Sequence, residues 1–303
     1  MKVRDLKANK IGGFLKGLEQ TGFQATQLAR AARAANEMLA DKDATVFFAF
    51  TSNLMASGLR GLFIDMAKKR MFDAVITAGG ALDHDLIRAY SDYDIGEFAS
   101  DDVALHKKSV NRLGNILVPN ERYVLLEKKM KPILAALYKR KKSMSPREIS
   151  TGIGKSLSGR QSFLGECAKN GIPVFCPGIT DSAVGLQLHF FKQDHRDFAV
   201  DVTADMGELA TLVLSAKRTG ALVLGGGISK HHTIASNLLR GGFDYAIYIT
   251  TAGEFDGSLS GARASEAVSW GKIREKGVTA TVHADATIAF PLLYSGLKAR
   301  RRL

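Results

Sequence analysis

Short apolar runs alternate along the chain with longer segments in which apolar residues recur at helical spacing. Such runs are typical of buried strands, because a strand covered on both faces reads as one hydrophobic stretch. Helices are predicted between the runs, the first two at 12–39 and 54–70, and a last helix follows the final run. Strands are predicted at 45–50, 73–77, 172–177, 197–202, 221–227, 245–250 and 279–286.

This alternation predicts an α/β fold. We expect a doubly wound, mostly parallel, Rossmann-like sheet with helices on both faces and an N-terminal helical extension. No fixed-period repeat, low-complexity segment or linker divides the sequence, so residues 1–303 are predicted to form a single domain. Residues 90–155 are less regular. They read as a loop region near 111–123, a helix with a basic run, and a further helix started by Ser145 and Pro146.

Polar and glycine-rich turns follow most of the predicted strands. In sheets of this class, ligands bind outside the carboxyl ends of the strands. The turns that would meet there are 52–53, 77–80, 180–181, 225–231, 251–256 and 285–287. The sequence therefore predicts a ligand site at one edge of the sheet. Ser52 and Asn53 are also expected to cap the helix that follows them.

Composition changes this picture only slightly. The formal net charge is +12, which would attract polyanions. The basic residues are scattered, apart from clusters at 139–142 and 298–302, and no aromatic residues interleave them as a base-stacking groove requires. We therefore expect a solvated basic surface or attraction to an acidic protein, and no direct nucleic-acid role.

The compartment is predicted from what the chain contains. Its two cysteines, Cys167 and Cys176, form no disulfide framework, which fits a reducing compartment. The N-terminus lacks the apolar run of a signal peptide, and no segment has the roughly 18 uninterrupted apolar residues of a membrane span. No cysteine or histidine spacing indicates a metal site. We expect a cytoplasmic protein without membrane or metal.

The stretch GEFDGSLSGARASEAVSWGKIR, residues 253–274, concentrates candidate chemistry. Its carboxylates suit amine substrates, its tryptophan can wall off an alkyl chain, and its lysine can act as a covalent nucleophile. The alternative is a polar loop followed by an ordinary amphipathic helix. The turns TAGG (77–80) and GGGISKHH (225–232) are each weak signals alone, but together at strand ends they fit a dinucleotide site.

Several segments closely resemble deoxyhypusine synthases. They include TSNLMASGLR, TAGGALDHDLIRAY, NRLGNILVPNERY, VLGGGISKHHTIASNLLRGGFDYAIYITTA, EFDGSLSGARASEAVSWGK and VHADATIAFPLL, in the family's order and across nearly the whole chain. The resemblance implies an NAD-dependent aminobutyltransferase. It places the nucleotide contacts on Ser52, Asn53, Thr77, Ala78, Gly79, Asp181, Gly226, Gly227, Thr251, Ala252, Asp285 and Ala286.

The resemblance also implies a mechanism. Lys272 would be the nucleophile and His231 would orient or deprotonate the amine, while Glu266 and Trp270 would bind the donor. A lysine attacks an imine carbon only as the neutral amine, which burial or a neighbouring cation favours. Spermidine would give an aminobutyl group to Lys272 and then to a lysine of the hypusine-containing translation factor precursor. The family's substrate loop falls on Asp256, Gly257, Ser258 and Ser260. The family forms homotetramers whose sites are shared between subunits.

Two positions depart from the pattern of the family's eukaryotic members. Leu186 and Leu259 stand where the resemblance implies aspartates that hold spermidine nitrogens. Asp83 and His84, in DHD after TAGG, could hold an amine instead. Alternatives therefore stay open: a different donor such as agmatine or putrescine, a homospermidine-synthase-like transfer to a small amine, or a noncatalytic NAD-binding subunit.

Overall fold

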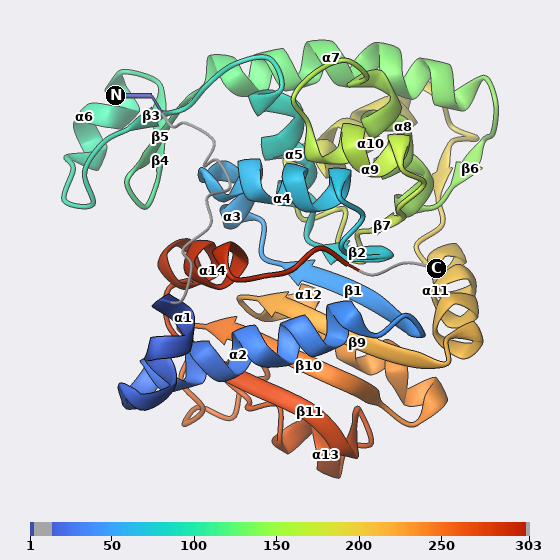
Figure 1. Ribbon diagram of the computed structural model, residues 1–303. Helices are drawn as coiled ribbons and strands as arrows, with labels where there is room; N and C mark the ends of the chain where they lie inside the picture. Colours follow the sequence, from blue (N-terminus) through green and yellow to red (C-terminus); the bar gives the residue numbers. More distant parts are fainter. Residues whose placement is uncertain (3–13, 301–303) are drawn as a thin grey trace.

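A computed structural model describes residues 1–2 and 14–300. Six strands form the central sheet in the order β11-β10-β9-β1-β2-β7 (Figure 1). Every pairing in this sheet is parallel, so all six carboxyl ends lie at one edge. The strands are β1 (Ala44–Phe50), β2 (Ala74–Thr77), β7 (Val174–Phe175), β9 (Arg218–Leu224), β10 (Phe243–Thr250) and β11 (Ile273–His283).

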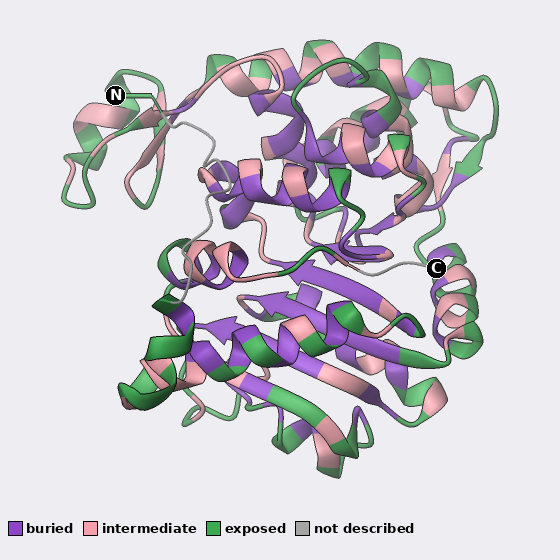
Figure 2. Cartoon of the chain, viewed as in Figure 1, coloured by how far each residue is buried: buried purple, intermediate pink, exposed green. Residues whose placement is uncertain are grey.

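Helices cover both faces of the sheet, as predicted. Alternate residues of β1 enter two separate cores, with Phe48 and Phe50 on one face and Phe47 and Ala49 on the other. The first face packs against α2 (Phe23–Ala40), α4 (Leu59–Lys68) and α14 (Ala286–Ser295). The second packs against α11 (Ala204–Ser215), α12 (Gly227–Ser236) and α13 (Glu266–Ser269). The inner strands β1, β2, β9 and β10 are accordingly buried along most of their length, whereas the edge strand β11 is largely exposed or half-buried (Figure 2).

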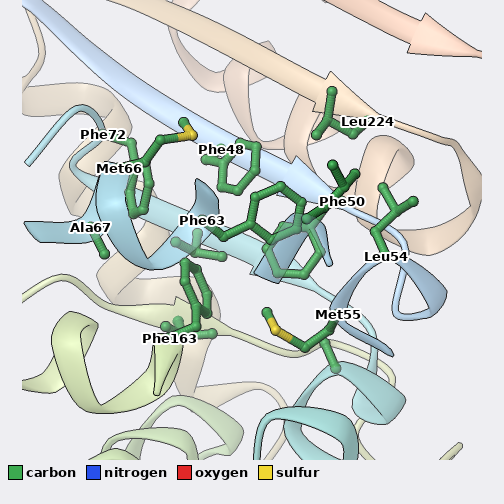
Figure 3. Packing of buried hydrophobic residues seen from close by; sticks show 14 of the residues in the cluster. Phe48, Phe50, Leu54, Met55, Phe63, Met66, Ala67, Phe72, Phe163 and Leu224 are labelled. Carbon is green, nitrogen blue, oxygen red and sulfur yellow. The ribbon is translucent and has the colours of Figure 1, made fainter. Parts of the chain in front are cut away.

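An aromatic cluster fills the first core. The rings of Phe50 and Phe63 lie 4.8 Å apart between centroids, and Phe163 packs edge-on against Phe50 at 5.5 Å (Figure 3). Phe48 stacks on Phe72 at 5.2 Å. Each buried aromatic side chain removes a large apolar area from water, so this cluster stabilises the contact between β1 and the helices above it.

An outer layer of helices lies beyond α4 in Figure 1. It comprises α5 (Gly79–Arg88), α7 (Glu121–Tyr138), α8 (Pro146–Ser156), α9 (Phe163–Lys169) and α10 (Ala183–Asp194). The predicted start of α8 is confirmed: Ser145 accepts a hydrogen bond from the Glu148 amide, and the Glu148 carboxylate accepts one from the Ser145 amide. This capping box satisfies two backbone donors that the first turn would leave unpaired.

The predicted strand at 197–202 is wrong as a member of the central sheet. Only β8 (Ala199–Val200) forms, and it pairs with β6 (Ser143–Met144) in a separate two-stranded sheet. The strand stops there because the Asp201 carboxylate accepts hydrogen bonds from the backbone amides of Thr203 and Ala204, at 3.0 and 3.1 Å, and turns the chain into α11.

The loop predicted near 111–123 is also structured. It forms the hairpin β4 (Val110–Leu113) and β5 (Ile116–Pro119), and α7 begins at Glu121. The turn depends on Gly114, whose φ of 62° suits glycine. With β3 (Asp94–Ile95) and α6 (Asp102–Lys107), the hairpin makes a small lobe beside the N-terminus in Figure 1.

Predicted helix 54–70 is two helices. α3 (Asn53–Ala56) ends at Ser57, where the backbone becomes extended, before α4 begins. Ser52 occupies the capping position of α3, but its side chain makes no capping hydrogen bond. At the N-terminus, α1 (Phe14–Gly17) and η1 (Leu18–Gln20) precede α2. The predicted helical residues 12–13, and 301–302 of the basic tail, lie outside the described residues. The expectation of one domain stays a prediction.

Candidate active site

A cavity of roughly 280 Å³ opens beside α12 and α13. Five residues predicted to act in catalysis or substrate binding line it together: His231, Gly257, Glu266, Trp270 and Lys272. They come from three separate parts of the chain: α12, the loop after β10, and the segment before β11. The fold therefore brings together side chains that the sequence could group only by their order.

Lys272 lies immediately before β11, and not on a helix as in the alternative interpretation of residues 253–274. α13 is only four residues long, and Gly271, with φ of 65°, turns the chain out of it. The Lys272 amide donates to Ala267 O at 2.9 Å and its carbonyl accepts from the Phe243 amide at 3.0 Å. Both backbone groups are thus fixed, and the residue is only 8% exposed.

The indole of Trp270 faces the amine of Lys272. The Nζ atom lies 5.0 Å from the centroid of the ring, within the range of a cation–π contact. Trp270 itself is 66% exposed. It therefore forms an outer wall of the cavity, while Lys272 lies deeper.

The loop between β10 and α13 has its own internal hydrogen bonds. Asp256 accepts from the Ser258 amide at 2.8 Å, and the Ser258 hydroxyl accepts from the Ser260 amide at 3.2 Å. Ser260 Oγ then accepts from the amide of Gly227, at 2.9 Å, at the start of α12. The loop is thereby attached to the helix that carries His231.

Two cavity residues were missed by the sequence reasoning. Lys230 is completely buried, and Tyr248 on β10 is 1% exposed with a hydroxyl that has no hydrogen-bond partner among the described residues. Burial lowers the pKa of Lys230 to about 8, although Glu266 opposes that shift. The sequence did place Lys230 directly before His231, but only the histidine was considered as a candidate.

The residues predicted to contact the nucleotide lie at the carboxyl ends of five strands of the central sheet or just after them. Asp181 lies further from its strand, between β7 and α10. Because the strands are parallel, these turns share one edge. A side-chain carbon on Gly79 would lie 2.6 Å from Ser182 Cβ, and one on Gly226 would lie 2.5 Å from Ser260 Cβ. Only glycine permits these approaches. The following residues are exposed or half-buried at this edge: Ser52, Asn53, Ala78, Asp181, Gly227, Thr251, Ala252 and Asp285.

Some of these residues already have internal partners. Thr77 is fully buried and its hydroxyl donates to Phe50 O at 2.9 Å. Asp285 caps α14 by accepting from the Thr287 amide at 2.6 Å, and Ala286 is buried in the first turn of that helix. These residues stabilise the backbone at the carboxyl edge of the sheet. Their contact with a nucleotide stays a prediction.

Asp83 and His84 lie on α5 and are not among the described residues that line the cavity. Both oxygens of Asp83 accept backbone amides at the start of α10, each at 2.8 Å, and burial raises its pKa to about 6. His84 Nδ1 lies 2.9 Å from the Tyr93 hydroxyl, and burial, with a smaller effect of Arg88, lowers its pKa to about 4. An amine-binding role for either residue stays a prediction.

The cavity wall carries more cationic than anionic side chains. Of the described residues that line it, Glu266 is the single carboxylate, against Lys230, Arg263 and Lys272. Arg263 is paired with Glu254 at 2.6 Å. The arrangement can hold one ammonium near Glu266, and it offers Lys272 as an amine nucleophile.

The family model for deoxyhypusine synthase matches residues 13–297. The chain belongs to the deoxyhypusine synthase family. It is 44% identical over 273 residues to a "probable deoxyhypusine synthase" of Thermoplasma volcanium, covering 90% of this chain and 88% of that protein. The same name is given to an Ignicoccus hospitalis protein that is 44% identical, with 98% and 93% covered. The deoxyhypusine synthase of the plant Senecio vernalis is 38% identical, with 95% and 85% covered.

The fold agrees with this family. A solved structure of an Entamoeba histolytica protein, described as a deoxyhypusine synthase, superposes with a TM-score of 0.72 at 22% identity, covering 95% of this chain and 93% of that one. The parallel α/β sheet predicted from the sequence is thereby confirmed. No helix among the described residues is long and apolar enough to cross a membrane. Nor do those residues include a cluster of three histidine, cysteine or acidic side chains able to hold a metal ion.

The two departures from the family pattern lie in different surroundings. Leu259 lines the cavity and packs against the second core, so an apolar side chain forms part of the cavity wall. Leu186 lies on α10 and is 50% exposed. Within the described residues, only Leu259 bears directly on what the cavity of this chain can bind.

Proposed function

We propose that this protein is a deoxyhypusine synthase that transfers an aminobutyl group from spermidine, or a related polyamine, to a lysine of the hypusine-containing translation factor precursor. One observation carries the proposal. The buried Lys272 shares a cavity with Glu266, His231 and Trp270, in a chain that the family model matches almost from end to end. A cytoplasmic location is part of this proposal.

NAD is the cofactor we infer, and the residues at the sheet edge fit a dinucleotide. α5 and α12 both begin with glycines at strand ends, where backbone amides can face phosphate oxygens. A side-chain carbon on Gly226 would overlap the substrate loop, which brings the two sites together. When bound, NAD would supply the redox chemistry: it would accept a hydride from the donor and later return that hydride to the product. Asp181, exposed after β7, is the candidate for a ribose hydroxyl.

The residues of this chain then act on the amine. Glu266 attracts the donor's ammonium, and Trp270 covers its methylene chain. Once the carbon beside the secondary nitrogen has lost a hydride, the donor is an imine. The neutral amine of Lys272 attacks that carbon, the carbon–nitrogen bond to the secondary nitrogen breaks, and diaminopropane leaves. His231, exposed on α12 at the cavity, can take up and return the proton that moves between these nitrogens.

Lys272 then carries the four-carbon group as an imine. The acceptor lysine attacks the same carbon, the bond to Lys272 breaks, and the new imine is reduced by the returned hydride. The balance requires no external oxidant, because the hydride removed at the start is returned at the end. Burial of Lys272 protects the enzyme-bound imine from hydrolysis by bulk water.

Incubation with NAD and spermidine labelled in its aminobutyl part, followed by borohydride, tests the proposal. We expect label on Lys272, and label on the translation factor when that protein is added. Label in homospermidine alone would indicate a transfer to small amines. NAD binding without any lysine adduct, for every donor tried, would indicate a noncatalytic subunit.

One observation favours a second candidate for the donor. Leu259 gives the cavity an apolar surface where relatives have a carboxylate, and a buried ammonium without a partner is costly. Agmatine or putrescine would present fewer or differently spaced cations than spermidine. Competition among the three donors for a limiting amount of enzyme would rank them.

We also infer a homotetramer. Two large aromatic side chains of the 253–274 segment are exposed: Phe255 is 96% exposed, and Trp270, on the cavity wall, is 66% exposed. Large exposed aromatic residues are typical of surfaces covered by a partner. Light scattering at micromolar protein should give four times the mass of one chain, and a monomer at that concentration would contradict this part of the proposal.

A further inference from the structure

Lys230 is a buried cation that has no carboxylate in hydrogen-bond contact within the described part of the chain. Its Nζ atom donates to the main-chain carbonyl of Ala262 at 2.7 Å and to that of Ser260 at 3.3 Å. It also lies 4.5 Å from the ring centroid of Tyr248. The side chain is 0% exposed and is among the largest fully buried side chains of the described part of the chain.

Such a lysine is costly for the fold. Neutral carbonyls replace only part of the hydration that an ammonium loses on burial, and apolar residues of similar size are often tolerated better at such positions. The lowered pKa of Lys230, about 8, reflects the same burial. Both hydrogen bonds of the Lys230 side chain go to carbonyls of the loop at the candidate active site. This indicates that the lysine stabilises the conformation of that loop.

The segment 260–262 is fixed on three sides. Ser260 Oγ accepts from the amide of Gly227 at 2.9 Å, and the hydroxyl of Thr250 donates to Ser260 O at 3.4 Å. Gly261 packs so tightly that a side-chain carbon would lie 1.6 Å from Gly253 O. Lys230 is a further attachment, and among these contacts it is the one that comes from the interior of α12.

We propose that Lys230 is a positioning residue for the amine donor, through its grip on Ser260 and Ala262. The segment it holds separates the loop residues Asp256–Ser258 from Glu266, and Lys230 is directly followed by His231. The lysine therefore fixes the distance between the loop that leads to Glu266 and His231 on α12. This role rests on the proposed function, since it is the donor whose binding depends on that distance.

Lys230→Met tests the role, because methionine keeps the volume and removes the ammonium. We expect this variant to fold, with a melting temperature equal to or above that of the wild type. Hydrogen exchange at the amides of Gly261 and Ala262, which donate to Ser258 O and Leu259 O, should become at least tenfold faster. The KM for the donor should rise about tenfold, while the dissociation constant for NAD changes less than twofold. Lys169→Met, on the exposed surface of α9, is the control and should change none of these.

Two results would overturn the inference: unchanged exchange at residues 261 and 262, or an unchanged donor KM in a folded variant. If Lys230→Met fails to fold, Lys230→Leu replaces it, because leucine also lacks a donor for the carbonyls of Ser260 and Ala262; wild-type exchange and KM in that variant would equally contradict the proposal. The exchange measurement needs no turnover. If the wild type shows no transfer at all, the proposed function fails while the grip on the loop is still tested.

Discussion

Asp83 and Asp85 lie two residues apart on α5, and they cap two different helices. Asp83 accepts from the first two amides of α10, each at 2.8 Å. Asp85 accepts from the amides of Phe163 at 3.0 Å and Leu164 at 2.8 Å, at the start of α9. The acidic motif that follows TAGG therefore holds two helices of the outer layer in place, whatever else it contacts.

We expect Asp85→Ala to lower the free energy of unfolding by about 3–5 kcal/mol, because it leaves a buried cation without its partner. Asp85 is 0% exposed and its Oδ1 lies 2.7 Å from Nε of Arg60, whose side chain is 2% exposed. Urea unfolding followed by circular dichroism measures the change. The matched control is Asp102→Ala, which breaks a solvent-exposed pair with Arg112 and should change the free energy of unfolding far less. Equal losses in the two variants would contradict this account of Asp85.

His84 should make the protein less stable in acid. Its pKa is about 4 in the folded state against 6.5 in the unfolded chain, so the unfolded state binds the extra proton between these values. Stability is therefore lost as pH falls from 6.5 to 4, by at most about 3 kcal/mol. Asp83, with a pKa raised to about 6, acts in the opposite sense: its contribution is lost as pH rises from 3.8 to 6.

Because the two residues offset each other, the wild-type profile alone is uninformative. His84→Gln should flatten the loss on the acid side of pH 6.5, and Asp83→Asn should steepen it. Urea midpoints measured from pH 4 to 7 would show this divergence. Parallel profiles for the two variants would mean that neither residue titrates as stated.

The parallel sheet could be predicted from the sequence because its strands are buried on both faces and read as apolar runs. The 197–202 segment has the same pattern, but a single Asp201 ends it after two residues of strand. The position of Lys272 was misjudged for a similar reason: α13 follows helical spacing for only one turn before Gly271 redirects the chain. Local turns of this kind do not alter hydrophobic periodicity.

For the cavity, the sequence grouped residues that the fold does bring together, such as Glu266 and Lys272. It could not reveal Lys230, because a buried lysine and a surface lysine look alike until the surrounding loop is folded. It also could not show that both oxygens of Asp83 are used by backbone amides, since α10 begins 100 residues further along the chain.

We expect Lys272→Ala to abolish aminobutyl transfer, by at least a thousandfold, and to change NAD affinity less than twofold. The variant lacks the amine that we propose carries the imine, while the nucleotide-contacting turns stay as they are. Borohydride trapping and fluorescence titration with NADH measure the two effects. Lys276→Ala, exposed further along β11, is the control. Full transfer by the Lys272 variant would remove this residue from the mechanism.

Glu266→Gln should raise the KM for the donor about tenfold or more, because it removes the single carboxylate among the described residues of the cavity wall. A hydrogen bond to a charged group contributes roughly 1.5–3 kcal/mol, which corresponds to a factor of ten to a hundred. Glu275→Gln, exposed on β11, should leave the KM unchanged. If Glu266→Gln lowers kcat alone, the carboxylate acts in the chemical step and not in donor binding.

Leu259→Asp should shift the donor preference towards spermidine. A carboxylate at this position in the cavity would pair with a nitrogen that the leucine leaves without a partner, and a charge-assisted hydrogen bond would strengthen its binding. We expect kcat/KM for spermidine to rise at least tenfold relative to putrescine. Val103→Asp, 66% exposed on α6, adds the same charge far from the cavity and controls for a general attraction of polycations. If Leu259→Asp lowers the ratio of spermidine to putrescine, the secondary nitrogen does not approach this wall, and the donor lies in the cavity with its apolar chain against position 259.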